Sequence, residues 1–180
     1  MRHIITHLVR GEAKHYHESL TKELVEKFEV FPIHDRIQPH LTLKRWFELG
    51  EMDMNILYGL LDSYAASHTQ SDYVMDSFDN FRDDVIFLDA RPSEKMQADV
   101  QDLIQILRTH PSLEFDEYDN GSDFHATLTM AALKEFDYDA IRSYLETIEQ
   151  PHFEMKFDNI ASMNKVDGKW VVDRIWELTE

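Results

Sequence analysis

The sequence predicts an α+β fold in which mainly antiparallel sheets are flanked by helices. Two observations carry this prediction. Segments with the apolar spacing of strands take turns along the chain with segments that have the apolar spacing of helices. The two halves also share one order: a strand that contains His-apolar-Thr-apolar, then a helix, then a pair of strands. We therefore expect the two motif strands to face each other across a pseudo-twofold axis, each near the middle of its sheet.

The other elements follow from local signals in chain order. Pro39 favours an extended backbone just before a predicted strand. Asp53, Ser93 and either Asp137 or Asp139 are predicted to cap three of the helices. Strands are expected over residues 2–9, 40–47, 73–81, 85–89, 124–130, 152–163 and 169–178, the last two around a turn at 166–169, and helices over 11–29, 53–64, 93–107 and 138–148.

Length and composition limit the kind of protein. A chain of 180 residues, 43% of them hydrophobic, can bury a core and is expected to form one two-lobed domain over residues 1–180. The absence of cysteine excludes disulfides, thiol catalysis and thiolate metal sites. No apolar run approaches the roughly 20 residues of a membrane-spanning helix, and the first residues lack the pattern of a signal peptide. We therefore expect a cytoplasmic protein that does not associate with membranes.

The net charge of −17 argues against extended binding to nucleic acid. Proteins that hold long RNA or DNA present basic surfaces to the phosphates, whereas the longest basic run here is Lys44-Arg45. No long duplex is therefore expected as a partner, although a local positive cleft can hold one or two phosphates. Solubility is the simpler explanation of the acidic surface itself.

The pattern His-apolar-Thr-apolar occurs twice, at residues 40–43 and 125–128, which are 85 residues apart. Ten histidines make chance copies of His-x-Ser unsurprising, and residues 17–19 and 110–112 are such accidents, one in a predicted helix and one beside a proline. The two strand copies differ because apolar residues follow in strict alternation and polar loops precede them. A single copy would favour a core histidine bonded to its neighbour, but two copies in equivalent contexts favour a function.

Side chains alternate along a strand, so each motif histidine lies on the same face as its threonine. Two such strands side by side give one cleft two imidazoles, His40 and His125, and two hydroxyls, Thr42 and Thr127. Imidazoles with a pKa near 6.5 can hold opposite protonation states at neutral pH and act as general acid and general base. The hydroxyls can bind the non-bridging oxygens of a phosphate. Which histidine is the acid and which is the base stays open.

Three further residues are in phase with the motifs and are candidates for substrate binding. Lys44 and Trp46 continue the face of His40, where they would reach a phosphate and stack on a base. A solvated lysine and a buried edge aromatic are the alternative interpretations. Thr129 continues the face of His125 and either extends the row of hydroxyls or pairs across strands.

A metal centre is the main chemical rival, because the chain has many histidines and carboxylates. It has no His-Glu-x-x-His, however, and its His-x-His lies in a predicted helix, where residues two apart do not share a face. We therefore expect no metal ion and no cofactor, and we expect His15 and His17 to be exposed. His3 and His7 lie on one face of the predicted first strand and are further candidates to line the cleft.

The motifs resemble those of the two-histidine phosphoesterase superfamily, which includes 2′–5′ RNA ligase-like proteins and 2′,3′-cyclic nucleotide phosphodiesterases. Residues 40–44, which end in a basic residue, are similar to the family's first motif, and residues 124–128, which begin with an aromatic, to its second. The resemblance spans most of the chain. It implies a bilobal fold of two antiparallel sheets with an open cleft that holds both motifs and needs no metal.

These observations predict a metal-independent phosphoesterase that uses the two histidines as acid and base. Its expected substrate is a 2′,3′-cyclic phosphate or a related small RNA or nucleotide phosphodiester, and the same groups run backwards could perform 2′–5′ ligation. The alternative from another class is a nucleotide- or phosphate-binding module on the same fold. Two complete His-x-Thr pairs argue against that alternative, because binding alone does not require two titrating groups. The substrate and the oligomeric state are not specified by the sequence.

Overall fold

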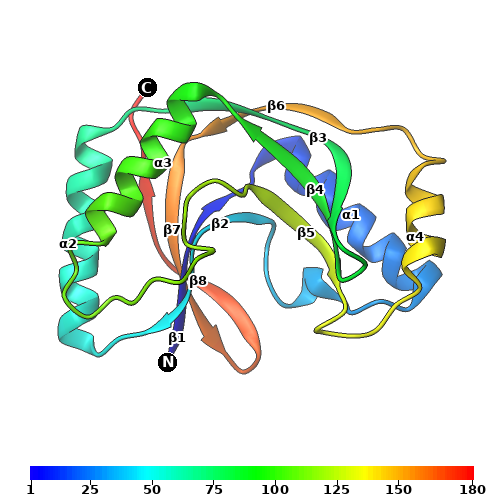
Figure 1. The fold of residues 1–180 in the computed structure, drawn as a ribbon, viewed down its shortest axis with the longest axis horizontal. Helices are drawn as coiled ribbons and strands as arrows, with labels where there is room; N and C mark the ends of the chain where they lie inside the picture. The colour runs from blue at the N-terminus through cyan, green and yellow to red at the C-terminus, as the bar shows by residue number, and fades with distance from the viewer.

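The computed structural model describes all 180 residues and has the α+β fold that the sequence predicts. Figure 1 shows α2 and α3 on one side of the molecule, α1 and α4 on the other, and the strands between them. The elements are β1 (Arg2–Leu8), α1 (Gly11–Phe28), the 3-10 turn η1 (Ile33–Asp35), β2 (His40–Glu48), α2 (Glu51–Ser67), β3 (Ser71–Phe81), β4 (Val85–Pro92), α3 (Glu94–Leu107), β5 (His125–Met130), α4 (Tyr138–Leu145), β6 (His152–Phe157), β7 (Asn159–Val166) and β8 (Lys169–Glu177).

The strands form two four-stranded antiparallel sheets with matching layouts. The first has the order β2-β1-β7-β8 and the second the order β5-β4-β3-β6, so a motif strand lies at the same edge of each. The expectation that the motif strands lie near the middle of their sheets is therefore wrong. An edge strand has one side free of its own sheet, and the free sides of β2 and β5 meet each other across the molecule (Figure 1). The two sheets thus approach each other along their motif strands.

The segment predicted as one strand over residues 152–163 is two strands in different sheets. β6 ends at Phe157 in the second sheet, and β7 begins at Asn159 in the first. At this crossing the side-chain amide of Asn159 binds the backbone of Leu8 at the end of β1. It accepts a hydrogen bond from the Leu8 amide at 3.0 Å and donates one to the Leu8 carbonyl at 3.1 Å. The apolar pattern runs through this crossing without a break, so the sequence does not reveal it.

The helix ends follow the predicted caps in two of three cases. The Ser93 hydroxyl accepts a hydrogen bond from the Met96 amide, and the Asp137 carboxylate accepts one from the Ala140 amide, so both residues cap their helices as predicted. The helix α2 instead begins at Glu51, with Gly50 as its cap. No helix combines the length and the apolarity that crossing a lipid bilayer would require.

Each sheet buries one face against helices. The main core is shared by α2 and α3 with the inner sides of β1 to β4, and a second core packs α1 and α4 against β4 and β5. The opposite face of the first sheet carries a small apolar cluster of Ile4, Leu8, Ala161 and Met163, covered by Ile37 from the loop before β2. In each motif the apolar residue after the histidine, Leu41 or Ala126, belongs to the main core, so the histidine and the threonine lie on the opposite face of the sheet.

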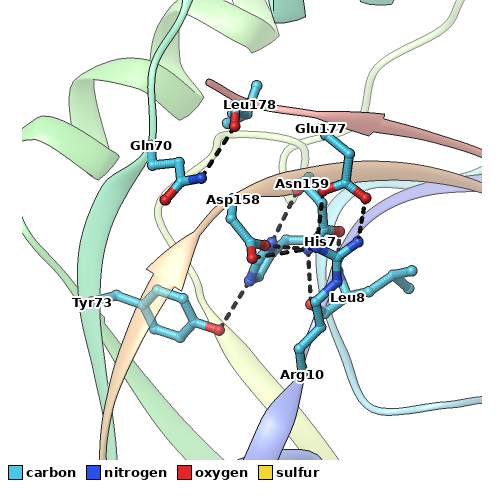
Figure 2. Close-up of polar contacts among 9 residues, drawn as sticks. All are labelled: His7, Leu8, Arg10, Gln70, Tyr73, Asp158, Asn159, Glu177 and Leu178. Atoms are coloured by element: carbon cyan, nitrogen blue, oxygen red, sulfur yellow. Dashed lines mark hydrogen bonds and ion pairs between the residues drawn. The ribbon is translucent and has the colours of Figure 1, made fainter. Parts of the chain in front are cut away.

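A buried histidine joins the two sheets, as Figure 2 shows. His7 of β1 donates from Nδ1 to the Asn159 carbonyl at 2.9 Å, so its Nε2 accepts from the Tyr73 hydroxyl of β3 at 3.0 Å. Burial lowers the pKa of His7 to about 4, which keeps the ring neutral. His3 is buried as well and bonds Asn164. Both histidines therefore belong to the core, and the expectation that they line the cleft is wrong.

Candidate active site

The first motif lies at the start of β2. His40 and Thr42 pair with Leu8 and Thr6 of β1, so both side chains lie on the helix-free face of the first sheet, while Leu41 points into the core. The His40 Nδ1 is 2.9 Å from the carbonyl oxygen of Gln38. A carbonyl only accepts hydrogen bonds, so Nδ1 carries the proton and the neutral ring has a bare Nε2.

The second motif repeats this arrangement at the start of β5. His125 lies opposite Asp89 of β4, and Thr127 lies opposite Phe87. The His125 ring packs against two phenylalanines, with its centroid 4.7 Å from that of Phe87 and 4.9 Å from that of Phe81. These contacts fix the plane of the ring, and its Nδ1 is buried without a hydrogen-bond partner.

The two motifs meet in one small pocket. His40 from β2 and Thr127 from β5 both line it, together with His17 from α1 and, from the segment before β2, residue 33 and residues 37–39. His125 is close enough for the charge on His40 to influence its protonation. The two motifs thus contribute side chains to the same pocket, although they are 85 residues apart in the sequence.

Burial controls the protonation of both motif histidines. It lowers the pKa of His125 to about 4, with a further lowering by His40 and an opposing effect of the Asp123 carboxylate. Burial also lowers the pKa of His40, against the hydrogen bond to Gln38. Both values lie below the 6.5 assumed from the sequence, so both rings are neutral at pH 7 in the free protein. A bound anion would favour the protonated form of either ring.

A β-bulge in β2 turns Lys44 away from the face of His40. Thr42 lies opposite Thr6 of β1. Lys44 lies opposite Ile5, the residue before Thr6, so β2 contains one extra residue between the two pairs. Because neighbouring residues of β1 point to opposite faces, Lys44 shares the core-facing side of Ile5. The expectation that Lys44 continues the face of His40 is therefore wrong.

The Lys44 ammonium is instead paired inside the protein. Its Nζ is 2.7 Å from Oδ2 of Asp119, and the two side chains are only 3% and 1% exposed. The Asp119 carboxylate also accepts hydrogen bonds from the backbone amides of Arg45, at 2.9 Å, and Asp116, at 3.1 Å. This pair fastens the loop over residues 108–124, which leads into β5, to the strand of the first motif.

The second motif has a bulge at the equivalent place. Thr127 lies opposite Phe87 of β4, but Thr129 lies opposite Ile86, so β5 also contains one extra residue. Thr129 thereby moves to the side of Ile86, where its hydroxyl is buried without a partner. The expectation that Thr129 extends the face of His125 is wrong for the same reason as for Lys44.

Trp46 lies near the far end of β2 and is 54% exposed. The Arg2 guanidinium covers its ring, at 4.6 Å from the ring centroid. Six residues of a strand span about 20 Å, so Trp46 is well separated from the pocket that His40 lines. Its part in substrate binding stays a prediction.

His17 was not expected in this region. It is 3% exposed, so the expectation that it lies on the surface is wrong, whereas His15 is exposed as expected. The signal was present in the sequence, because His17 is spaced with Ala13 and Leu20 at the helical period of a buried face.

A cavity of about 490 Å³ lies elsewhere, between the start of α1 and β6, and no motif residue lines it. Its walls mix residues 10–13 with residues 152–156 and Asp158, which include both acidic and basic side chains. We place the candidate site at the motif pocket because His40 and Thr127, one residue from each motif, both line it, and because His125 is close enough to His40 to be influenced by its charge. No three histidines and carboxylates lie close enough anywhere to hold a metal ion.

The sequence matches the family model described as the 2′-5′ RNA ligase superfamily over residues 13–173, a stretch that includes both motifs. The chain belongs to this superfamily. No curated protein matches the sequence. Membership of the 2′-5′ RNA ligase superfamily supports a phosphoesterase-type enzyme.

Solved structures of low sequence identity share the superfamily fold over nearly the whole chain. TT0787 of Thermus thermophilus is 18% identical with a TM-score of 0.63, and apo LigT of E. coli is 16% identical with a TM-score of 0.61; each match covers 99% of this chain and 98% of the other. Usb1 of Kluyveromyces marxianus is 12% identical, with a TM-score of 0.53 and 98% of both chains covered.

Proposed function

We propose that this protein is a metal-independent phosphoesterase that opens a 2′,3′-cyclic phosphate or a related small RNA or nucleotide phosphodiester. His40 and His125 are the acid–base pair, Thr42 and Thr127 bind the phosphate oxygens, and residues 1–180 act as one two-lobed domain. The observation that carries the proposal is the meeting of the motif strands at facing edges, which leaves His40 and Thr127 in one pocket. The complexes of E. coli LigT with ATP, 3′-AMP and phosphate support a small nucleotide as the ligand class.

The proposed reaction transfers one proton at each histidine. A base takes a proton from water as the water oxygen bonds to phosphorus, and an acid protonates the ribose oxygen as its bond to phosphorus breaks. The product is a phosphate monoester with a free ribose hydroxyl. The bare Nε2 that the Gln38 hydrogen bond gives to His40 favours His40 as the base. Burial lowers the pKa of His125, and the Asp123 carboxylate opposes that lowering. A bound phosphate anion would oppose it further, so we assign His125 as the acid.

The threonines have a separate proposed role. Negative charge builds on the non-bridging oxygens of the phosphate as water attacks, and a fixed hydroxyl donor stabilises that charge. Thr42 and Thr127 each follow their histidine by two residues on the same face, ahead of the bulge that ends the alternation. The bulges thus limit each motif to one histidine and one threonine.

The lowered pKa values of His40 and His125 predict different pH optima for kcat/KM, which reports the free enzyme, and for kcat, which reports the substrate-bound enzyme. The proposed reaction needs one protonated and one neutral histidine, and both pKa values are lowered in the free protein. The bell-shaped pH dependence of kcat/KM should therefore be centred below pH 6.5. A bound phosphate anion raises the pKa of the histidine that acts as the acid. The bell-shaped pH dependence of kcat should therefore be centred at a higher pH than that of kcat/KM. Coincident bells centred above pH 7 would contradict this account.

Turnover in chelator tests the proposed function. The purified protein is treated with EDTA and assayed against the four 2′,3′-cyclic mononucleotides and short oligoribonucleotides with cyclic-phosphate ends. We expect hydrolysis to a single monoester isomer at an undiminished rate, because imidazoles supply both proton transfers. Loss of turnover that zinc or manganese restores would overturn the metal-free mechanism. Saturable binding without turnover would favour the alternative of a nucleotide-binding module.

A further inference from the structure

A third histidine lies at the motif pocket and has no part in the proposed proton transfers. His17 projects from the buried face of α1, is 3% exposed and lines the pocket together with His40 and Thr127. It comes from a helix that packs against β5, so it belongs to neither motif.

The His17 ring holds the second motif through its backbone. Its Nε2 is 2.9 Å from the carbonyl oxygen of Thr127. Because that oxygen can only accept, Nε2 carries the proton and donates it. β5 is an edge strand with a sheet neighbour on one side only, so this bond adds a fixed contact from α1 at the residue whose hydroxyl the proposed reaction uses.

The other nitrogen of the ring shows that packing alone does not favour a histidine here. Nδ1 of His17 is buried and has no hydrogen-bond partner. Burial lowers the pKa of His17 to about 4, with a smaller lowering by His40 and His34 and an opposing effect of the Thr127 bond, so the ring stays neutral and Nδ1 stays bare. Burying a bare acceptor is unfavourable, whereas a leucine would fill the space without that penalty. The histidine makes one interaction that leucine cannot make, the hydrogen bond to the carbonyl oxygen of Thr127.

We propose that His17 is a positioning residue of this site, which fixes Thr127 by donating Nε2–H to its carbonyl oxygen and thereby sets the second motif against His40. The proposal rests on the proposed function. His17 itself exchanges no proton during the reaction. Its effect reaches the substrate through the Thr127 hydroxyl and through His125, two residues earlier on the same strand.

Three substitutions separate positioning from packing and from acid–base catalysis. His17→Gln keeps an N–H donor at a similar reach, His17→Leu keeps the bulk without a donor, and His15→Leu is the control on the exposed side of α1. We expect His17→Leu to lower kcat on a cyclic nucleotide by about 10- to 100-fold with KM changed by less than about threefold. His17→Gln should recover kcat to within about fivefold, and His15→Leu should leave it unchanged.

The outcomes that overturn the proposal are distinct. Full activity of His17→Leu would show that the bond has no role in the reaction. Equal losses in His17→Gln and His17→Leu, with one limb of the pH profile missing from both, would make His17 an acid or base. If His17→Leu does not fold, His17→Asn takes its place, because its shorter amide cannot reach Thr127. Failure of both to fold would make His17 a residue of the fold alone.

A second readout is independent of turnover. In the wild-type protein, nuclear magnetic resonance of the ring nitrogens should show His17 neutral at pH 6 with its proton on Nε2. The backbone amide signals around Thr127 should stay near their wild-type positions in His17→Gln and shift in His17→Leu. If no substrate is turned over, the proposed function fails while these signals still test the positioning role. A proton on Nδ1, or equal shifts in both variants, would contradict that role.

Discussion

Replacing either His40 or His125 by alanine is expected to lower kcat/KM on a 2′,3′-cyclic nucleotide by at least about 10²–10⁴-fold, the usual contribution of a general acid or base. The measurement is steady-state kinetics at the pH optimum of the wild type. His152→Ala is the matched control, because this histidine lies exposed on β6, at the edge of the second sheet away from β5. It should keep wild-type kinetics. Full activity in His40→Ala or His125→Ala would refute the assignment.

The threonines are expected to matter less than the histidines in the same assay. Thr42→Val or Thr127→Val removes one hydroxyl and keeps the shape of the side chain. The loss should be on the order of 2–4 kcal/mol at most in transition-state stabilisation, as for one donor to a developing oxyanion. Both variants should keep the shape of the pH profile, since they leave both proton carriers in place.

The second large effect is expected on stability, at the buried pair of Lys44 and Asp119. Lys44→Met leaves the Asp119 carboxylate buried without its cation, and should lower the free energy of unfolding by about 3–5 kcal/mol. Adding Asp119→Asn removes the unpaired charge and keeps an oxygen acceptor for the amides of Arg45 and Asp116. The double variant should therefore be more stable than Lys44→Met. Urea unfolding followed by circular dichroism measures both differences.

A neighbouring ion pair provides the control for this stability prediction. Arg45 and Asp116 lie 3.3 Å apart with side chains 45% and 52% exposed. Arg45→Ala keeps the backbone amide that Asp119 uses and breaks only exposed contacts, namely the ion pair and the cation–π contact with Tyr118. It should therefore cost about 1 kcal/mol, clearly less than Lys44→Met. Similar losses for Arg45→Ala and Lys44→Met would show that burial does not set the strength of the Lys44 pair.

The Lys44 pair also links the two halves of the site. Asp119 belongs to the loop over residues 108–124, and this loop delivers the chain into His125. Lys44 belongs to the strand that begins with His40. The basic residue after the first motif thus forms an ion pair inside the protein, and its side chain does not face the proposed phosphate site.

The parts of the fold that local patterns determine could be predicted from the sequence. The alternation around Thr42 and Thr127 gave both motif strands, and Ser93 and Asp137 gave two helix starts. The departures come from tertiary structure. Which strands pair with each other determines that β2 and β5 are edge strands and that the chain passes from one sheet to the other at Asp158, and local sequence patterns do not contain this information.

The two bulges explain the errors in the candidate site. A period of two along each strand predicts that Lys44 and Thr129 lie on the motif faces, but a bulge inserts one residue before each of them and moves it to the other face. No residue type at Leu43 or Leu128 signals that insertion. His17 is a different case, because its helical spacing with Ala13 and Leu20 is visible in the sequence. The interpretation of His15 and His17 together, as two residues on different faces, does not take that spacing into account.

A double-mutant cycle on His40 and His125 tests the central claim most directly, namely that the two histidines act together on one phosphate. The cycle compares kcat/KM for the wild type, His40→Ala, His125→Ala and the double variant on one cyclic nucleotide in EDTA. Once one proton transfer is lost, the concerted path is already disabled, so the second substitution should add little. We expect the double variant to be far more active than the product of the two single losses predicts. A loss equal to that product would show that the histidines act independently and would contradict a shared site.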